Sequence, residues 1–260
     1  HNNPFSGGTH LPDLTVVTPF LYNNKVVYYL ANRAHHSDIG GITPGSMPAF
    51  SKSINEEGIV FDGFPILEKG KIKEQQLLKK LNEKKYGSRD PEQNLYDIKA
   101  QLASNQRGIL ELKKIISSYG KETVNKYVDF IKENCSEIIF KKIKKISNSA
   151  FSSKMDNGAL IKVKINFDKK IKKLKIDFTG SSEQLSNNFN TPLAVTKSVI
   201  IYFLRTLITK DIPLNEGFLK DILIIIPKNS MLNPSYPSPV VAGNVETSQH
   251  LIDILNVALK

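Results

Sequence analysis

Two apolar stretches near the start, LTVVTPFLY (Leu14 to Tyr22) and KVVYYLA (Lys25 to Ala31), decide the local fold, together with the pair Asn23-Asn24 between them. Both stretches are rich in β-branched and aromatic residues, which favour strands. Asparagine tolerates the positive φ that a two-residue turn requires. The segment therefore predicts a β-hairpin, which brings the chain back to the place where the hairpin began.

A His-x-x-Asp unit lies at each end of this hairpin. His10 and Asp13 precede it after the pair Gly7-Gly8, while His35 and Asp38 follow it before the pair Gly40-Gly41. The hairpin places the two units side by side in our prediction. Two imidazoles and two carboxylates form a mixed nitrogen and oxygen set that suits Zn²⁺, Mn²⁺ or Fe²⁺. A metal held there can polarise a carbonyl or lower the pKa of a bound water.

The same residues also admit a purely structural interpretation. Asp13 and Asp38 are then turn formers that cap the following segments, and the histidines pack or form hydrogen bonds. His36 is a further candidate, either as a general base in catalysis or as a group that orients a ligand.

The rest of the chain predicts an α+β fold, with β-hairpins, a sheet and a central block of amphipathic helices. Residues 70–146 carry apolar residues at helical spacing, and Asp90-Pro91 and Gly120 mark the start and the end of one helix. Expected strands are Ile59 to Phe64, Ala159 to Phe167, Lys172 to Phe178 and Leu223 to Ile226, and expected helices are Thr191 to Ile208 and the segment that follows Gly243.

Composition narrows the class of protein. The chain has 260 residues, 40% of them hydrophobic, and a net charge of +11. The basic side chains are almost all scattered lysines, a pattern that does not favour a nucleic-acid surface. Apolar runs such as Ile222 to Ile226 are far too short to span a bilayer. A single cysteine, Cys135, fits a reducing cytoplasm.

Two loops that precede helices suggest a second binding region. Asn190 and Thr191 stand before one expected helix, and Asn244 and Glu246 stand before the last. Free N–H groups at a helix start can bind a carboxylate or a phosphate. Turn formation and helix capping explain the same residues, and no Walker phosphate-binding loop is present.

Several blocks resemble the hydantoinase B family, in its 5-oxoprolinase branch. The blocks are Gly7 to Asp13 (GGTHLPD), Asn32 to Pro48 (NRAHHSDIGGITPGSMP), Lys99 to Gln101 with Asn105 to Gly108, Asp177 to Gly180, Asn190 to Thr196 and Val241 to Gln249. They follow one another in the family's order over nearly the whole chain. The resemblance covers the central part of a hydantoinase B region, so residues 1–260 are expected to form a single region that is incomplete at both ends. Its expected segments are β-rich (1–68), helical (70–146) and α+β (159–260).

The resemblance implies a cytoplasmic, ATP-dependent hydrolase of a cyclic amide. The expected reactions are the conversion of 5-oxo-L-proline to L-glutamate, in glutathione metabolism, or the hydrolysis of N-methylhydantoin. A hydantoinase A-like partner is expected to hold ATP and Mg²⁺, and the active protein to be an oligomer. In related carboxylases the B-type subunit holds a divalent metal (Mn, Zn, Fe or Mg), and this implies His35, Asp38, His10 and Asp13 as ligands here.

One position departs from the family pattern. Asn3 stands where the family usually has aspartate, which removes a negative charge that a cation would favour. This leaves two alternatives open: an inactive or assembly-only subunit, and a subunit with chemistry like that of acetone or acetophenone carboxylase.

Overall fold

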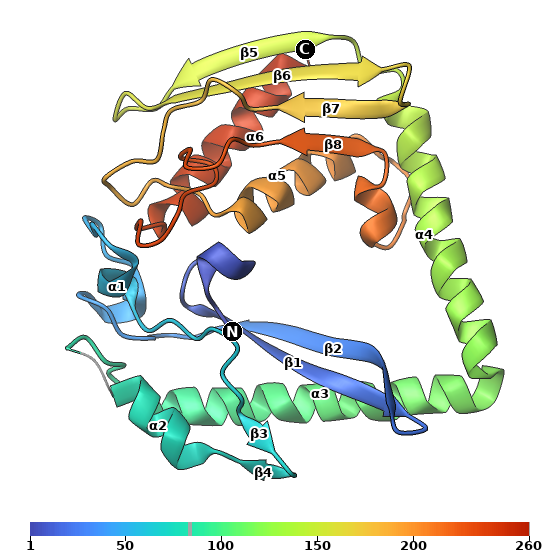
Figure 1. Cartoon of the computed structure of the whole chain (residues 1–260). Coiled ribbons are helices and arrows are strands. Elements are labelled where there is room, and N and C mark those ends of the chain that lie inside the picture. Colours follow the sequence, from blue (N-terminus) through green and yellow to red (C-terminus); the bar gives the residue numbers. More distant parts are fainter. Residues whose placement is uncertain (83–84, 260) are drawn as a thin grey trace. The chain divides into compact units, whose positions relative to one another are not determined.

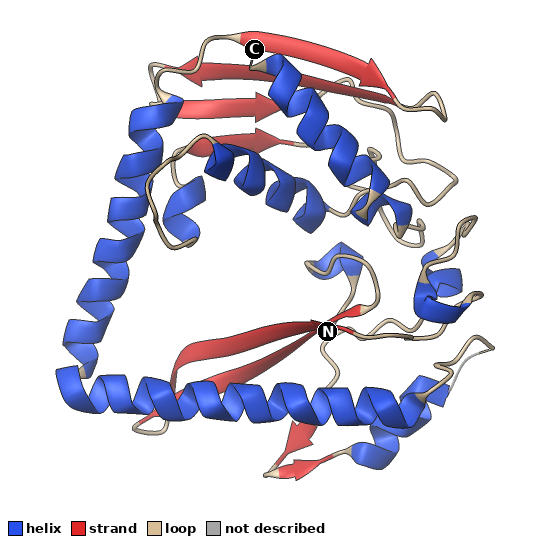
Figure 2. Cartoon of the chain, turned by 180° about the vertical axis from the view of Figure 1, so that it is seen from behind, coloured by secondary structure: helices blue, strands red, loops and turns tan. Residues whose placement is uncertain are grey.

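The computed structural model describes residues 1–82 and 85–259, which divide into two compact units (Figures 1 and 2). The first unit comprises His1–Ser118 with the short segments Ser186–Asn188 and Tyr236–Ala242, and the second contains the remaining described residues. The α+β fold expected from the sequence is confirmed. No helix in the described part of the chain is long and apolar enough to cross a membrane.

The first unit is built on the predicted hairpin. Strand β1 (Asp13–Tyr22) pairs antiparallel with β2 (Lys25–His35), and Asn23 and Asn24 both adopt positive φ in the turn. Helix α3 (Pro91–Tyr119) lies along the hairpin in both views. The remaining elements are η1 (Pro4–Ser6), η2 (Pro44–Ser46), α1 (Ile54–Glu57), β3 (Leu67–Glu68), β4 (Lys71–Ile72) and α2 (Glu74–Asn82).

The strand expected at Ile59 to Phe64 is wrong. This segment is irregular, and its backbone bonds the single residue Asn2 and not a strand: the Phe61 N–H donates to the side-chain Oδ1 of Asn2, and the Phe61 carbonyl accepts from the backbone N–H of Asn2. Ile59 and Phe61 still face inward, and they pack in one apolar core with Leu14, Ile39, Leu95 and Ile98.

The second unit is a four-stranded sheet with helices against one face (Figures 1 and 2). The strand order is β5 (Ser149–Lys154), β6 (Leu160–Asp168), β7 (Lys173–Asp177), β8 (Ile222–Ile225), with only β7 and β8 parallel. The helices are α4 (Lys121–Ile143), α5 (Leu193–Thr206) and α6 (Glu246–Ala258), with the short turns η3 (Glu216–Leu219) and η4 (Ala242–Asn244).

The predicted alternation along β6 is confirmed. Ile161, Val163 and Ile165 are buried, while Lys162 and Lys164 are exposed on the opposite face. Strand β5, which the sequence analysis did not predict, completes the sheet. It has a polar sequence, and only its pairing with β6 makes it a strand.

The start of helix α5 differs from the prediction. The helix begins at Leu193 and not at Thr191, because Pro192 has an extended backbone with a ψ of 147°. Helix α6 lies in the segment expected after Gly243, and the hydroxyl of Thr247 in its first turn donates to the Phe189 carbonyl.

A buried carboxylate holds the segment Tyr236–Ala242 in the first unit. Glu57 is fully buried, and its Oε1 accepts hydrogen bonds from the N–H groups of Val240 and Val241 and from the Ser51 hydroxyl. Burial raises the pKa of Glu57 to about 7 from 4.5, although these hydrogen bonds oppose the shift. The folded state therefore binds a proton at Glu57 more tightly than the unfolded chain does.

This raised pKa predicts a loss of stability as the pH rises. The contribution of Glu57 is fully present below pH 4.5 and is lost as the pH passes about 7, which amounts to roughly 3 kcal/mol. Glu57→Gln, which is neutral at every pH, should flatten the dependence of the unfolding free energy on pH in this window. Denaturant titrations at several pH values measure this effect. The exposed Glu92→Gln is the matched control, and identical profiles for the wild type and Glu57→Gln would contradict the prediction.

Candidate metal centre

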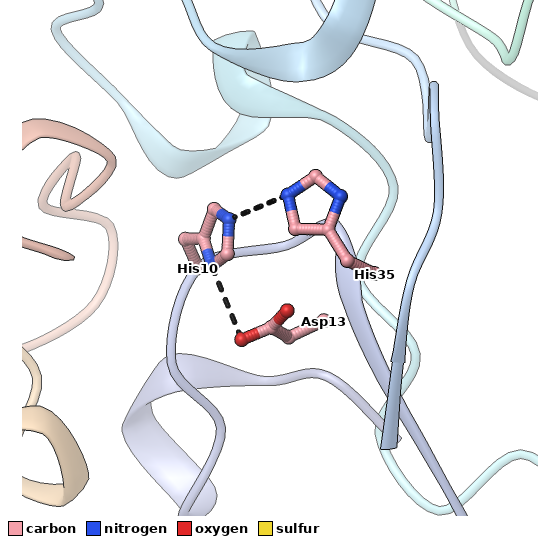
Figure 3. Close-up of side chains that lie close together, drawn as sticks. All are labelled: His10, Asp13 and His35. Atoms are coloured by element: carbon pink, nitrogen blue, oxygen red, sulfur yellow. Dashed lines mark hydrogen bonds and ion pairs between the residues drawn. The ribbon is translucent and has the colours of Figure 1, made fainter. Parts of the chain in front are cut away.

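The hairpin brings three of the four predicted ligands together (Figure 3). Asp13 and His35 are directly opposite one another in the register of β1 and β2. His10 reaches the same place from the preceding loop, with its Nε2 3.1 Å from His35 Nε2 and its Nδ1 3.4 Å from Asp13 Oδ2. One ligand atom from each side chain can be chosen so that all three lie within 4.8 Å of one another.

The loop that carries His10 is held by a close backbone contact and by Asn2. A Cβ at Gly8 would lie 2.4 Å from the Asn2 carbonyl oxygen, so only glycine fits there. The fully buried Asn2 side chain donates to the carbonyls of Leu11 and Ile59. The sequence analysis missed this role of Asn2. Its adjacency to the Gly-Gly loop was the available signal.

The donor set fits a divalent cation. Each side chain can offer one ligand atom, and two imidazole nitrogens and a carboxylate oxygen within 4.8 Å of one another are a donor set that Zn²⁺, Mn²⁺ or Fe²⁺ accepts. His10 is 4% exposed, and its Nδ1 has no hydrogen-bond partner of acceptable geometry. Buried polar atoms are rarely left in this state unless another group completes the site.

The carboxylate of this group is held in its charged form. Burial raises the pKa of Asp13, but the close contact with His10, the hydrogen bond from Thr9 and the nearby charge of Arg33 outweigh it and hold the pKa below its usual value. The Thr9 hydroxyl donates to Asp13 Oδ2 at 2.6 Å. Asp13 is therefore an anionic candidate ligand, and the hydrogen bond from Thr9 fixes its orientation.

Asp38 lies outside the group of three. Its carboxylate accepts from the N–H groups of Gly40 and Gly45 and from the Arg89 guanidinium, at 2.8 to 2.9 Å. Burial raises the pKa of Asp38, and these hydrogen bonds lower it more, so the net shift is downward. These contacts fix the loop that follows β2.

His36, the predicted catalytic residue, is fully buried against α3. Its Nδ1 lies 2.9 Å from Asn94 Oδ1, and its Nε2 lies 3.2 Å from Gln101 Oε1. The NH₂ group of Asn94 donates to the Asp38 carbonyl and the Ser88 hydroxyl. The NH₂ group of Gln101 donates to the Leu14 carbonyl and to Asn32 Oδ1. Neither ring nitrogen is left to accept a proton from a substrate, so these contacts favour a positioning role over that of a general base.

Three buried amides on α3 tie the hairpin to this helix, and the sequence analysis missed their function. Asn94, Gln101 and Asn105 recur at helical spacing, and Gln101 and Asn105 donate to the carbonyls of Leu14 and Val16 on β1. Asn32 of β2 donates to Asn105 Oδ1 and to the Gln101 carbonyl. The signal was a run of amides on the helix face that otherwise packs inward.

The second predicted region lies in the other unit, and its side chains serve mainly the fold. Asn190 and Thr191 are fully buried. The Asn190 side chain accepts from the Leu185 N–H through Oδ1 and donates to the Leu185 carbonyl through Nδ2. The Thr191 hydroxyl donates to the Gly243 carbonyl. Asn244 is half-buried and Glu246 is exposed, in the first turn of α6.

The amide face of α3 generates a prediction about stability. Gln101→Met keeps the length of the side chain but removes its hydrogen bonds to His36 Nε2, the Leu14 carbonyl and Asn32 Oδ1. Each unsatisfied buried group costs about 1 to 3 kcal/mol, so the unfolding free energy should fall by at least about 2 kcal/mol. The exposed Ser104→Ala on the same helix is the control. Equal denaturant midpoints for the two variants would show that this network contributes nothing.

The structure thus defines an α+β protein with a candidate divalent-metal centre of two histidines and one aspartate. The family model "Hydantoinase B/oxoprolinase" matches residues 1–260, and the chain belongs to that family. This confirms the resemblance drawn from the sequence blocks.

Similar proteins agree with this assignment. The chain is 40% identical to 5-oxoprolinase 1 of Arabidopsis thaliana, over 100% of this chain and 22% of that protein. It is also 40% identical to the 5-oxoprolinase of Saccharomyces cerevisiae, over 98% of this chain and 21% of the relative. The chain therefore spans about a fifth of the length of these relatives.

Two solved structures share the fold. The ATP-dependent caprolactamase of Pseudomonas jessenii has a TM-score of 0.81 at 19% identity, over 100% of this chain and 45% of that chain. A nucleotide-free acetone carboxylase has a TM-score of 0.79 at 14% identity, over 94% and 34%. At these identities the likeness shows the fold alone.

Proposed function

We propose that residues 1–260 form a single hydantoinase B-like region of an ATP-dependent hydrolase of cyclic amides, and that the substrate is 5-oxo-L-proline. The observation that carries the proposal is the group of His10, Asp13 and His35, in a chain 40% identical to 5-oxoprolinases from a plant and a yeast. N-methylhydantoin is the alternative substrate of the same class.

In this proposal His10, Asp13 and His35 hold one divalent cation, Mn²⁺, Zn²⁺, Fe²⁺ or Mg²⁺. Such a cation supplies Lewis acidity toward a carbonyl oxygen or a bound water. Asp13 contributes a negative charge, and Thr9 orients it. His36 acts as a positioning residue, because both its ring nitrogens bond amides of α3 and so fix the end of β2 beside His35. Asp38 fixes the adjoining loop through Arg89.

The nucleotide chemistry belongs to another part of the enzyme. Residues 1–260 contain no Walker loop, and the relatives named 5-oxoprolinase are several times longer than the matched region. A hydantoinase A-like region or subunit is therefore assigned the ATP and Mg²⁺ site. We also infer an oligomeric assembly and a cytoplasmic setting, which the single buried Cys135 fits. Asn244 and Glu246 are the accessible members of the second region that can contact substrate or phosphate.

Asn3 does not by itself favour the inactive alternative. Its side chain accepts from the Phe5 N–H and caps η1, a role that aspartate fills equally well. The departure from the family therefore changes one charge and preserves the local structure.

Metal content tests the centre directly. The purified protein should contain about one divalent metal per chain by elemental analysis, and His10→Ala and His35→Ala should lose it. Thr9→Val should weaken metal affinity by about 10- to 100-fold, because Thr9 only orients a ligand. His250→Ala, in α6, is the matched histidine control. Circular dichroism checks that each variant is folded, and a folded wild type without metal would contradict the centre.

Turnover tests the substrate. The complete enzyme, with a hydantoinase A-like partner, ATP and Mg²⁺, should convert 5-oxo-L-proline to L-glutamate, and His35→Ala should abolish this. Release of product from N-methylhydantoin alone would reassign the substrate. Consumption of bicarbonate with acetone or acetophenone would support the carboxylase alternative, and a protein without either activity would support an assembly role.

A further inference from the structure

The face of the hairpin that carries the candidate metal centre also carries an arginine. Asp13 lies opposite His35 in the register of β1 and β2, and the next pair on the same face is Thr15 opposite Arg33. Leu14, between the two pairs, is buried in the apolar core on the α3 side, whereas Arg33 and His35 are exposed. Residues two apart on a strand are about 6.6 Å apart along it. Arg33 is therefore the neighbour of the candidate centre on this open face.

A hydrogen bond orients the guanidinium of Arg33. Its Nε donates to the Thr15 hydroxyl oxygen at 2.9 Å, across the two strands. Within residues 1–82 and 85–259, no protein acceptor lies within hydrogen-bond distance of its Nη1 or Nη2. The guanidinium is thus held by one edge, and the fork of its two terminal nitrogens is open to a ligand.

The charge of Arg33 also lacks a contact partner, which sets this residue apart. The other three arginines each form an ion pair with a carboxylate: Arg89 with Asp38, Arg107 with Glu111 and Arg205 with Asp211. The nearest candidate for Arg33 is Asp13, but the Asp13 carboxylate is directed to Thr9 and His10 instead. In the described part of the chain, Arg33 is the arginine that retains its charge for an anion from outside.

We propose that Arg33 binds the carboxylate of 5-oxo-L-proline and thereby selects this substrate, an inference that rests on the proposed function. The planar guanidinium offers two parallel N–H donors, which match the two oxygens of a carboxylate. In 5-oxo-L-proline the carboxylate is on one carbon bonded to the ring nitrogen, and the lactam carbonyl is the other. A ring whose carbonyl faces His10, Asp13 and His35 therefore carries its carboxylate to an adjacent position, where Arg33 lies.

This contact separates the two candidate substrates. N-methylhydantoin is a cyclic amide of similar size that has no carboxylate. Its binding would leave the fork of Arg33 without an acceptor, and a site built to bond a polar group discriminates strongly against an analogue that lacks the group. Arg33 is therefore a specificity residue that favours 5-oxo-L-proline.

Arg33→Met in the complete enzyme, with its hydantoinase A-like partner, tests the contact. This change keeps the apolar stem and removes the charge. The KM for 5-oxo-L-proline should rise about 10- to 100-fold, which is the typical loss of a charge-assisted hydrogen-bonded pair. The kcat should change little, because the carboxylate takes no part in breaking the C–N bond. Equilibrium dialysis of 5-oxo-L-proline without ATP should show the same loss of affinity.

Two further variants separate charge from orientation. Arg33→Lys keeps the charge but loses the fork and the bond to Thr15, so it should recover only part of the affinity. Thr15→Val keeps the shape of the side chain and removes the acceptor of Nε. It should raise the KM for 5-oxo-L-proline by less than Arg33→Met does, with kcat again little changed.

The controls distinguish recognition of the carboxylate from damage to the fold. The inhibition constant of 2-pyrrolidinone, the same ring without the carboxylate, should be unchanged in Arg33→Met, and so should the metal content. Arg107→Met, at an exposed position on α3, should leave the KM for both compounds unchanged. Equal weakening of 2-pyrrolidinone and 5-oxo-L-proline in Arg33→Met would overturn the inference.

Failure of this inference differs from failure of the proposed function. An enzyme that converts 5-oxo-L-proline with the same KM in the wild type and in Arg33→Met overturns the role of Arg33 alone. A wild type that hydrolyses N-methylhydantoin but neither binds nor converts 5-oxo-L-proline overturns the proposed substrate and this inference together.

Discussion

The candidate metal centre depends on the register of a single hairpin. Because Asp13 lies opposite His35, two candidate ligands that are far apart in sequence become neighbours across β1 and β2, and His10 needs only a short loop to join them. A slip of one residue would turn His35 to the opposite face of the hairpin. The geometry of the candidate metal centre is therefore set by the strand pairing more than by any one side chain.

The amides of α3 protect this register in a way that apolar packing does not. Asn94, Gln101 and Asn105 bond specific backbone oxygens and specific side chains of the hairpin and of His36, so a shifted strand would leave buried polar groups unsatisfied. Apolar side chains accept small shifts more readily. Helix α3 therefore both packs against the hairpin and fixes its register.

The two His-x-x-Asp units have the same spacing, but their aspartates are surrounded by different groups. Asp13 faces two imidazoles and a hydroxyl, and it belongs to the candidate centre. Asp38 meets the backbone of Gly40 and Gly45 and the guanidinium of Arg89, which satisfy its oxygens. A carboxylate whose oxygens are all bonded within the protein is held as a loop anchor. Its proposed role as a ligand therefore has weaker geometric support than that of Asp13.

The sequence by itself determined the hairpin, the amphipathic helices and the α+β class, because strand alternation, turn residues and helical periodicity are local properties. It predicted a His/Asp group of four residues, and the structure brings three of them together. It also carried the family blocks. Only the tertiary structure decided the strand β5, the irregular path at Phe61, the buried state of His36 and the inward orientation of Asn190 and Thr191. These depend on partners distant in the chain: β6 for β5, Asn2 for Phe61, and α3 for His36. No local pattern specifies which distant group a buried polar atom will meet.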